Sequence, residues 1–241
     1  MKTTAIILAA GQGKRMKSNR NKQFLEVKGK PIVVYTIDAF LKHPYIEDIL
    51  LVVNENEVEV MEKEIVTKYF EKRVKKITLV VGGKERYNSV HNALAILDDA
   101  CDYVLVHDGA RPLVSSQEIS DSVNILSSEK ASVLGVKAKN TYKLINDDHY
   151  ITSTVPREFL YSILTPQSFR KEIIVEAYEK GIGRFEGITD DGMMVEKALK
   201  IPVKLIEGSY NNIKITTPED LVTMDRIVEV WFISIKLLTR G

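Results

Sequence analysis

Short, continuous apolar runs alternate along the first half of the chain with longer segments in which apolar residues recur at helical spacing. Four runs predict strands buried on both faces, over residues 4–8, 49–53, 77–81 and 103–106. The segments between them predict helices with one apolar face, over residues 31–42, 57–70 and 86–97. This alternation of strand and helix predicts right-handed crossovers and a parallel sheet.

The second half of the chain continues this pattern less regularly. Helices are expected over residues 117–126, 171–180 and 193–199 and from 217 onward, and strands over 131–136, 159–164, 203–206 and 212–215. No segment has the composition of a domain linker. We therefore predict a single domain over residues 1–241 in the α/β class, with a Rossmann-like, mostly parallel twisted sheet flanked by helices.

Residues 137–157 break the pattern because polar residues dominate them. Residues 142–145 alternate between polar and apolar, and Asn146, Asp147 and Asp148 signal a turn, so the segment predicts a β-hairpin arm that leaves the main body. An isolated hairpin is only marginally stable in water. We therefore expect the arm to pack on a second subunit.

The residues that follow the predicted strands carry the candidate chemistry, because ligands of parallel sheets bind beyond the carboxyl ends of the strands. The first strand leads into residues 9–16, which contain Gly11, Gly13 and Arg15, with Lys22 close behind. Glycine turns with exposed backbone N–H groups and basic side chains suit a polyphosphate. A dinucleotide fingerprint would need a third glycine where Met16 stands, and the loop lacks the Gly-Lys-Ser/Thr of a Walker loop. Taken alone, this loop is equally consistent with an ordinary turn.

Composition narrows the choice of partners. The 34 Lys and Arg residues nearly balance the 33 Asp and Glu residues, so no global field favours nucleic acid or an anionic membrane. The single cysteine, Cys101, excludes an intrachain disulfide. The apolar run near the N-terminus is too short for a secretory signal, and the run over 228–238 is too short to span a bilayer. We expect a cytoplasmic protein without nucleic-acid or membrane partners.

Seven motifs occur in an order that matches a known family. They are Ala9–Met16, Lys22-Gln23, Gly82-Gly83 with Arg86 and Ser89, Val106–Pro112, Thr165–Gln167, Thr189–Asp191 and Asn212–Thr216. In these motifs the chain resembles the sugar-alcohol-phosphate cytidylyltransferases, and among them the 2-C-methyl-D-erythritol 4-phosphate cytidylyltransferase family of the non-mevalonate isoprenoid pathway. The resemblance covers residues 4–225. It implies the nucleotidyltransferase fold, a reaction of CTP with the alcohol phosphate that releases pyrophosphate, a requirement for Mg²⁺, and a homodimer formed through the arm.

The resemblance also implies roles for individual residues. Arg15, Lys22 and Lys214 would be catalytic, and Asp108 would help to hold Mg²⁺. The residues expected to receive CTP are Ala10, Gly11, Gly13, Gly83 and Ser89. The residues expected to bind the alcohol phosphate are Arg111, Thr141, Arg157 and Thr165, with Thr141 and Arg157 near the arm.

The implied reaction explains which catalytic residues are missing from the motifs. A phosphate monoester is mostly a dianion near neutral pH, so it needs no general base to become a nucleophile. His107 therefore need not be catalytic, and Asp190-Asp191 is interpreted as a helix cap. Two alternatives stay open: a ribitol-5-phosphate cytidylyltransferase, and a non-catalytic nucleotide-binding protein on the same fold.

Overall fold

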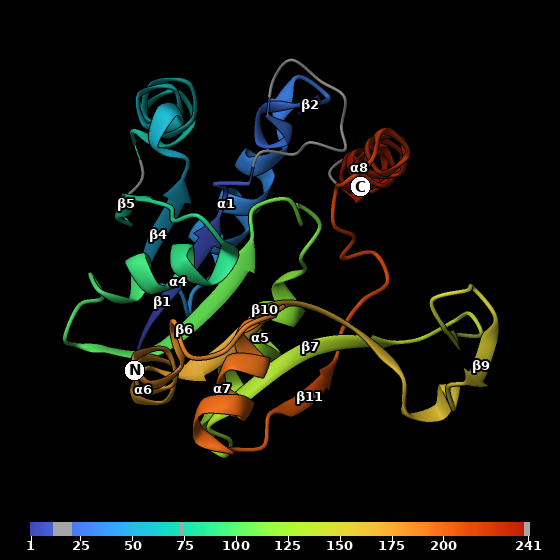
Figure 1. Cartoon of the computed structure of the whole chain (residues 1–241). Helices are drawn as coiled ribbons and strands as arrows, with labels where there is room; N and C mark the ends of the chain where they lie inside the picture. Colours follow the sequence, from blue (N-terminus) through green and yellow to red (C-terminus); the bar gives the residue numbers. More distant parts are fainter. Residues whose placement is uncertain (12–20, 73–74, 239–241) are drawn as a thin grey trace.

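The fold is seen in a computed structural model that describes residues 1–11, 21–72 and 75–238, with side chains described as far as Trp231. A seven-stranded twisted sheet forms its centre, in the order β11-β7-β10-β6-β1-β4-β5 (Figure 1). The strands are β1 (Lys2–Leu8), β4 (Asp48–Val53), β5 (Ile77–Val81), β6 (Cys101–Asp108), β7 (Ala131–Lys137), β10 (Tyr161–Arg170) and β11 (Lys204–Glu207). The predicted Rossmann-like α/β architecture is confirmed.

Two layers of helices cover the sheet. Alternate residues of β1 show the division: Ala5 and Ile7 belong to the apolar core on one face, and Ile6 belongs to the core on the other. The first face is covered by α1 (Ile32–Lys42), the helical segment Val58–Phe70 and α5 (Ser116–Asn124). The second face is covered by α4 (Arg86–Leu94), α6 (Lys171–Gly181) and α7 (Asp191–Leu199). Because both faces are covered, the strands read in the sequence as continuous apolar runs.

The helical segment over 58–70 contains a π-helical stretch, Met61–Thr67, between the short α-helices α2 (Val58–Val60) and α3 (Lys68–Phe70). Near the N-terminal loop, Lys22–Phe24 forms a 3-10 turn, followed by the two-residue strands β2 (Glu26–Val27) and β3 (Lys30–Pro31). The long C-terminal helix α8 (Pro218–Leu238) packs beside β2, where Lys28 pairs with Asp225 at 3.0 Å. Of the helices described in the structure, none is both long and apolar enough to cross a membrane.

Strand β10 differs from the prediction in its length and its direction. It continues through Thr165 and Pro166 to Arg170, where the sequence predicted a strand over 159–164. It runs antiparallel to both β6 and β7, and its pairing with β7 shifts register between Ile163 and Gln167. Polar residues in this stretch hid the strand from the sequence pattern, although Gln167 and Ser168 are fully buried.

The predicted strand over 212–215 is wrong, because this segment is irregular in the structure. Several of its polar groups bond to side chains and loops instead of to a strand ladder. Asn212 Nδ2 donates to Glu118 Oε1 and to the Thr165 carbonyl, Arg111 Nη1 donates to the Asn212 carbonyl, and Ile215 N donates to Ala110 O. These bonds hold the segment against the carboxyl ends of the strands.

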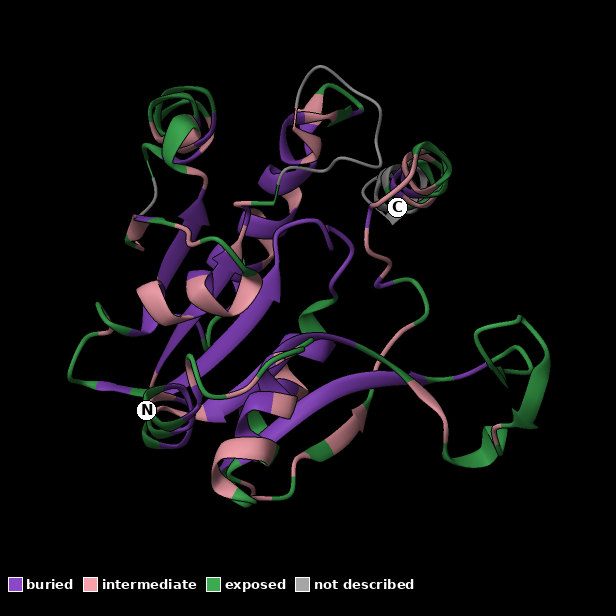
Figure 2. Ribbon diagram, viewed as in Figure 1, coloured by how far each residue is buried: buried purple, intermediate pink, exposed green. Residues whose placement is uncertain are grey.

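The arm is a hairpin, as predicted. Strands β8 (Lys143–Ile145) and β9 (Ile151–Thr154) pair antiparallel, and every residue of both strands is exposed. Figures 1 and 2 show the arm extending away from the sheet, with no helix layer against it. Its exposed apolar side chains include Leu144, Tyr150 and Ile151.

Glu118 offers a test of how the irregular segment is held. One carboxylate oxygen accepts from Ser115 N and Oγ, and the other accepts from Ser209 N and Asn212 Nδ2. We expect Glu118→Ala to lower the free energy of unfolding by about 2–4 kcal/mol, because it removes the buried carboxylate that accepts four hydrogen bonds and joins α5 to the irregular segment. Urea denaturation measures the change.

The neighbouring Gln117→Ala serves as the control, because Gln117 is exposed and bonds only Asp121 on the same helix in the described structure. We expect it to change stability by less than about 0.5 kcal/mol. Equal unfolding midpoints for Glu118→Ala and Gln117→Ala would contradict this account of the segment.

Candidate active site

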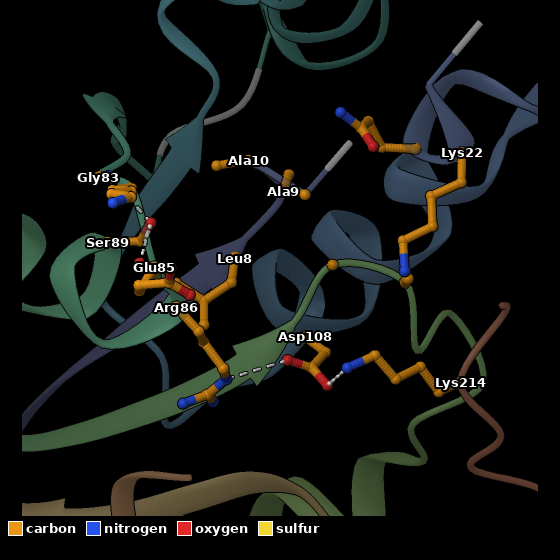
Figure 3. A pocket seen from close by; sticks show the side chains of 15 residues that line it. Leu8, Ala9, Ala10, Lys22, Gly83, Glu85, Arg86, Ser89, Asp108 and Lys214 are labelled. Carbon is orange, nitrogen blue, oxygen red and sulfur yellow. Dashed lines mark hydrogen bonds and ion pairs between the residues drawn. The ribbon is translucent and has the colours of Figure 1, made fainter. Parts of the chain in front are cut away.

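A cavity of about 230 Å³ opens at the carboxyl ends of β1 and β6 (Figure 3). It brings together predicted residues that lie far apart in the sequence, namely Ala10, Gly11, Lys22, Gly83, Ser89, Asp108 and Lys214. Because β1, β4, β5 and β6 are parallel, the residues that follow β1, β5 and β6 meet at this edge of the sheet. Gly13 and Arg15 lie outside the described residues.

On the α4 side of this cavity, the turn at Gly83 packs closely against the first part of helix α4. A Cβ atom at Gly83 would lie 2.3 Å from the Cβ of Asn88, so the turn has no room for a side chain. Gly83 N donates to Ser89 Oγ at 3.0 Å, which fixes the turn on the first part of helix α4. At Gly83 and Ser89 the wall therefore consists of backbone and a small side chain.

Asp108, at the end of β6, lies among three cations. Lys214 Nζ is 2.8 Å from Asp108 Oδ2, Arg111 Nε is 3.6 Å from the same oxygen, and Arg86 Nε is 3.7 Å from Oδ1. Burial alone would raise the pKa of the Asp108 carboxyl, but Lys214, Arg86 and Arg111 hold it well below its usual range. Asp108 is therefore a carboxylate at neutral pH, beside more positive than negative charge.

Arg86 contacts two carboxylates, Asp108 and Asp191. Its Nη1 and Nη2 bond Asp191 Oδ1 and Oδ2 at 2.9 and 2.8 Å, a bidentate pair. Asp191 is fully buried and also accepts from Tyr178 Oη at 2.5 Å. Burial lowers the pKa of Arg86, but Asp191 and Asp108 outweigh it and raise the pKa above its ordinary value.

The sequence analysis placed neither Arg86 nor Asp191 among the site residues. Both lie in motifs that it recognised, but their contact joins residues 105 positions apart. Asp190 is the helix cap that the sequence predicted, since its side chain accepts from Met193 N at 2.8 Å. Asp191 is not a cap but the counter-ion of Arg86.

A second cavity, of about 300 Å³, adjoins the first and shares Arg86, Asp108 and Lys214 with it. Its other lining residues include the predicted Arg111 and Thr165, together with Thr189, which the prediction did not include. Arg111 is mostly buried, and Lys214 comes from the irregular segment, not from the strand that the sequence suggested. The three shared side chains therefore form a charged wall between the two cavities.

His107 lies behind this wall and is fully buried. Its Nε2 is 3.1 Å from the Arg111 carbonyl, and its Nδ1 is 3.0 Å from Thr165 Oγ1. Burial lowers the pKa of His107 to about 4, so the ring is neutral at pH 7. His107 lines neither cavity, which agrees with the prediction that it need not be catalytic.

Two predicted substrate residues are not brought to these cavities. Thr141 and Arg157 are exposed at the base of the arm, and Arg157 Nη1 donates to the Lys139 carbonyl at 3.1 Å. Neither lines either cavity of its own chain. Their predicted role therefore has no support from contacts within one chain.

Comparison with known proteins adds an independent finding. The profile of the 2-C-methyl-D-erythritol 4-phosphate cytidylyltransferase (IspD) family matches residues 3–230. The chain belongs to the IspD family. A curated IspD of Lachnoclostridium phytofermentans is 45% identical over 230 residues, which cover 94% of this chain and 96% of that protein. One from Alkaliphilus oremlandii is 43% identical over 228 residues.

Solved structures agree with the IspD assignment. The crystal structure of 4-diphosphocytidyl-2C-methyl-D-erythritol synthase from Anaerococcus prevotii superposes with a TM-score of 0.82 at 34% identity, covering 95% of this chain and 96% of that one. The Francisella tularensis IspD has a TM-score of 0.78 at 28% identity. The predicted family is confirmed, and the chain is a cytidylyltransferase of the non-mevalonate pathway, which decides against the ribitol-phosphate and non-catalytic alternatives.

The buried histidine predicts how stability depends on pH. The unfolded chain binds a proton at His107 near pH 6.5, whereas the folded chain resists it until about pH 4. Acid therefore favours the unfolded state, and we expect His107 to account for a loss of about 2 kcal/mol of unfolding free energy between pH 7 and pH 5.

Urea denaturation at the two pH values measures this effect. In His107→Asn the loss between pH 7 and pH 5 should shrink by about that amount, because the asparagine amide does not titrate there. The control is His149→Asn, which changes an exposed histidine in the arm turn and should retain the wild-type loss. The same pH dependence in all three proteins would contradict the neutral, buried state of His107.

Proposed function

We propose that the chain transfers the cytidylyl group of CTP to 2-C-methyl-D-erythritol 4-phosphate and releases pyrophosphate at the two adjoining cavities. The observation that carries this proposal is the wall of Arg86, Asp108 and Lys214 that both cavities share. A reaction between two anions needs two binding spaces whose reactive ends meet beside concentrated positive charge. This arrangement provides both.

The first cavity is assigned to CTP. Gly83 and Ala10 offer a wall without bulky side chains, against which the base and ribose can lie, and Ser89 Oγ fixes that wall. Lys22 enters from the opposite side, on the 3-10 turn that follows the phosphate loop. Lys22, together with Arg15 in the loop itself, would bind the triphosphate.

The second cavity is assigned to the alcohol phosphate. Its phosphate is a dianion at neutral pH, and Arg86, Arg111 and Lys214 surround the space where it would approach the shared wall. Thr165 and Thr189 offer hydroxyl groups for the alcohol. The attacking oxygen and the α-phosphorus of CTP would then meet next to Lys214.

Catalysis on this account consists of positioning and charge neutralisation. The phosphate attacks the α-phosphorus directly, and the bond to the pyrophosphate oxygen breaks as the new one forms. Lys214 and Lys22 would stabilise the negative charge that spreads over the α-phosphoryl oxygens. No general base is required, which agrees with a neutral His107 that lies outside the cavities.

Asp108 fits the proposed Mg²⁺. Among the described residues no three His, Cys, Asp or Glu side chains group to hold a metal ion by themselves. Mg²⁺ in nucleotide sites needs only one or two carboxylates, because substrate phosphate oxygens and water complete its shell. Asp108 supplies one ionised hard ligand in the nucleotide cavity, and the ion would neutralise phosphate charge there.

The arm supports a homodimer. Leu144, Ile145, Tyr150 and Ile151 are each more than half exposed on a hairpin that has no core of its own. We propose that the arm packs on a second copy of the chain, and that Thr141 and Arg157 act at the partner's site. The proposed location is the cytoplasm, where CTP is made.

The activity is tested by pyrophosphate release with CTP and Mg²⁺. Wild type is compared on 2-C-methyl-D-erythritol 4-phosphate and ribitol 5-phosphate, and we expect a strong preference for the first. Lys214→Ala should lower kcat at least about a hundredfold, because one cation is lost where charge develops.

Lys204→Ala is the control for Lys214→Ala, because Lys204 is an exposed lysine on β11, away from both cavities. It should retain wild-type turnover. If wild type released no pyrophosphate with either alcohol phosphate, the proposed function would be overturned. Full turnover by Lys214→Ala would overturn only the role of that lysine.

The dimer is tested by size-exclusion chromatography with light scattering. We expect wild type to elute as a dimer. The double variant Leu144→Glu with Ile151→Glu should elute as a monomer with reduced kcat/KM, because it places charges where the proposed dimer interface would bury apolar side chains. Ile96→Glu, at an exposed apolar position near α4, should remain dimeric. A monomeric, fully active wild type would contradict the role of the arm.

A further inference from the structure

His107 and Thr165 form a hydrogen-bond chain whose direction can be read from its ends. At one end, His107 Nε2 lies 3.1 Å from the Arg111 carbonyl, which can only accept, so Nε2 carries the proton. The ring is fully buried, and its hydrogen-bond partners are a carbonyl and a hydroxyl and not a carboxylate, so it is neutral and Nδ1 has a lone pair and no proton. Thr165 Oγ1, 3.0 Å away, must therefore donate its hydroxyl proton to Nδ1.

The second contact of Thr165 uses one of its lone pairs. Asp108 N donates to Thr165 Oγ1 at 3.0 Å. A hydroxyl has one proton and two lone pairs. With the proton given to His107 and one lone pair taken by Asp108 N, Thr165 Oγ1 keeps a single lone pair. Thr165 itself lines the second cavity.

The ring that fixes this direction has no freedom to turn. His107 is fully buried, and its centroid lies 4.9 Å from that of Phe40 at an interplanar angle of 52°. A flipped ring would place a carbon atom against the Arg111 carbonyl and another against Thr165, and it would lose both hydrogen bonds. The orientation of the Thr165 hydroxyl is therefore determined by the fold before any ligand enters.

We propose that His107 is a positioning residue that makes Thr165 a hydrogen-bond acceptor for a hydroxyl group of the sugar-alcohol phosphate. A fully ionised phosphate oxygen has no proton to give, so it cannot bond the remaining lone pair of Thr165. An alcohol hydroxyl can. The proposal rests on the function proposed above and adds to it the group that Thr165 recognises and the residue that sets its polarity.

The consequence is selectivity for one hydroxyl. An acceptor of fixed direction rejects an analogue that lacks the matching donor, because its lone pair is then buried without a partner. Thr165→Val keeps the shape of the side chain and removes the acceptor. We expect it to raise KM for 2-C-methyl-D-erythritol 4-phosphate about tenfold, with a smaller change in kcat, and Thr165→Ser to restore most of the loss.

The role of His107 is tested by a double-mutant cycle. His107→Leu removes the acceptor for the hydroxyl proton and should raise the same KM about tenfold, whereas His107→Asn can place its amide oxygen near the position of Nδ1 and should retain more affinity. Because both residues act through one hydroxyl, the double variant His107→Leu with Thr165→Val should raise KM about tenfold, as each single variant does, and not about a hundredfold. Ser168→Ala, which removes another buried β10 hydroxyl bonded to Ser132, is the control and should leave this KM unchanged.

Analogues of the alcohol phosphate with one hydroxyl at a time replaced by hydrogen complete the test. With wild type, one analogue should have a kcat/KM about tenfold lower than that of the parent substrate. With Thr165→Val, the same analogue and the parent substrate should have equal kcat/KM. The proposal is overturned if every analogue loses the same factor with both enzymes, or if the two mutations multiply. If His107→Leu does not fold, the analogue series with Thr165→Val still tests whether Thr165 accepts a hydrogen bond from one hydroxyl of the substrate. Failure of wild type on the parent substrate would instead overturn the proposed function.

Discussion

The structure of the site depends on the Asp108 carboxylate and the three cations beside it. A buried carboxylate is costly unless cations and hydrogen bonds compensate it, and Arg86, Arg111 and Lys214 supply that compensation from three separate parts of the chain. The same contacts hold the three cations close together. The site therefore keeps an excess of positive charge in place, and on the proposed function little reorganisation is needed when the phosphates bind.

The rest of the fold keeps these four side chains in place. The parallel strands bring the ends of β1 and β6 to one edge, and the antiparallel β10 brings polar residues to the same region. Gln167 on β10 accepts from Asp191 N and Gly192 N, so it fixes the start of α7, whose Asp191 holds Arg86. Glu118 and Asn212 do the same for the segment that carries Lys214. These hydrogen bonds fix the geometry of both segments.

Much of this could be predicted from the sequence. Continuous apolar runs indicated the parallel strands, the residues after them indicated the edge of the sheet where the first cavity opens, and the alternating polar segment indicated the arm. The errors share a physical cause, because they concern residues whose structure depends on distant partners. Gln167 and Ser168 belong to a strand although they are polar, residues 212–215 are irregular although they alternate, and Asp191 pairs with Arg86 on another helix. Local patterns carry no information about such contacts.

The central claim is that one phosphate attacks the other directly across the shared wall, without a covalent intermediate on the protein. Stereochemistry at the α-phosphorus tests this claim most directly. CTP with sulfur in one defined position on the α-phosphorus would be converted with the alcohol phosphate, and the configuration of the product determined by phosphorus NMR. A single in-line displacement gives inversion, which this account predicts. Retention would mean two displacements through a cytidylyl-enzyme intermediate and would contradict it.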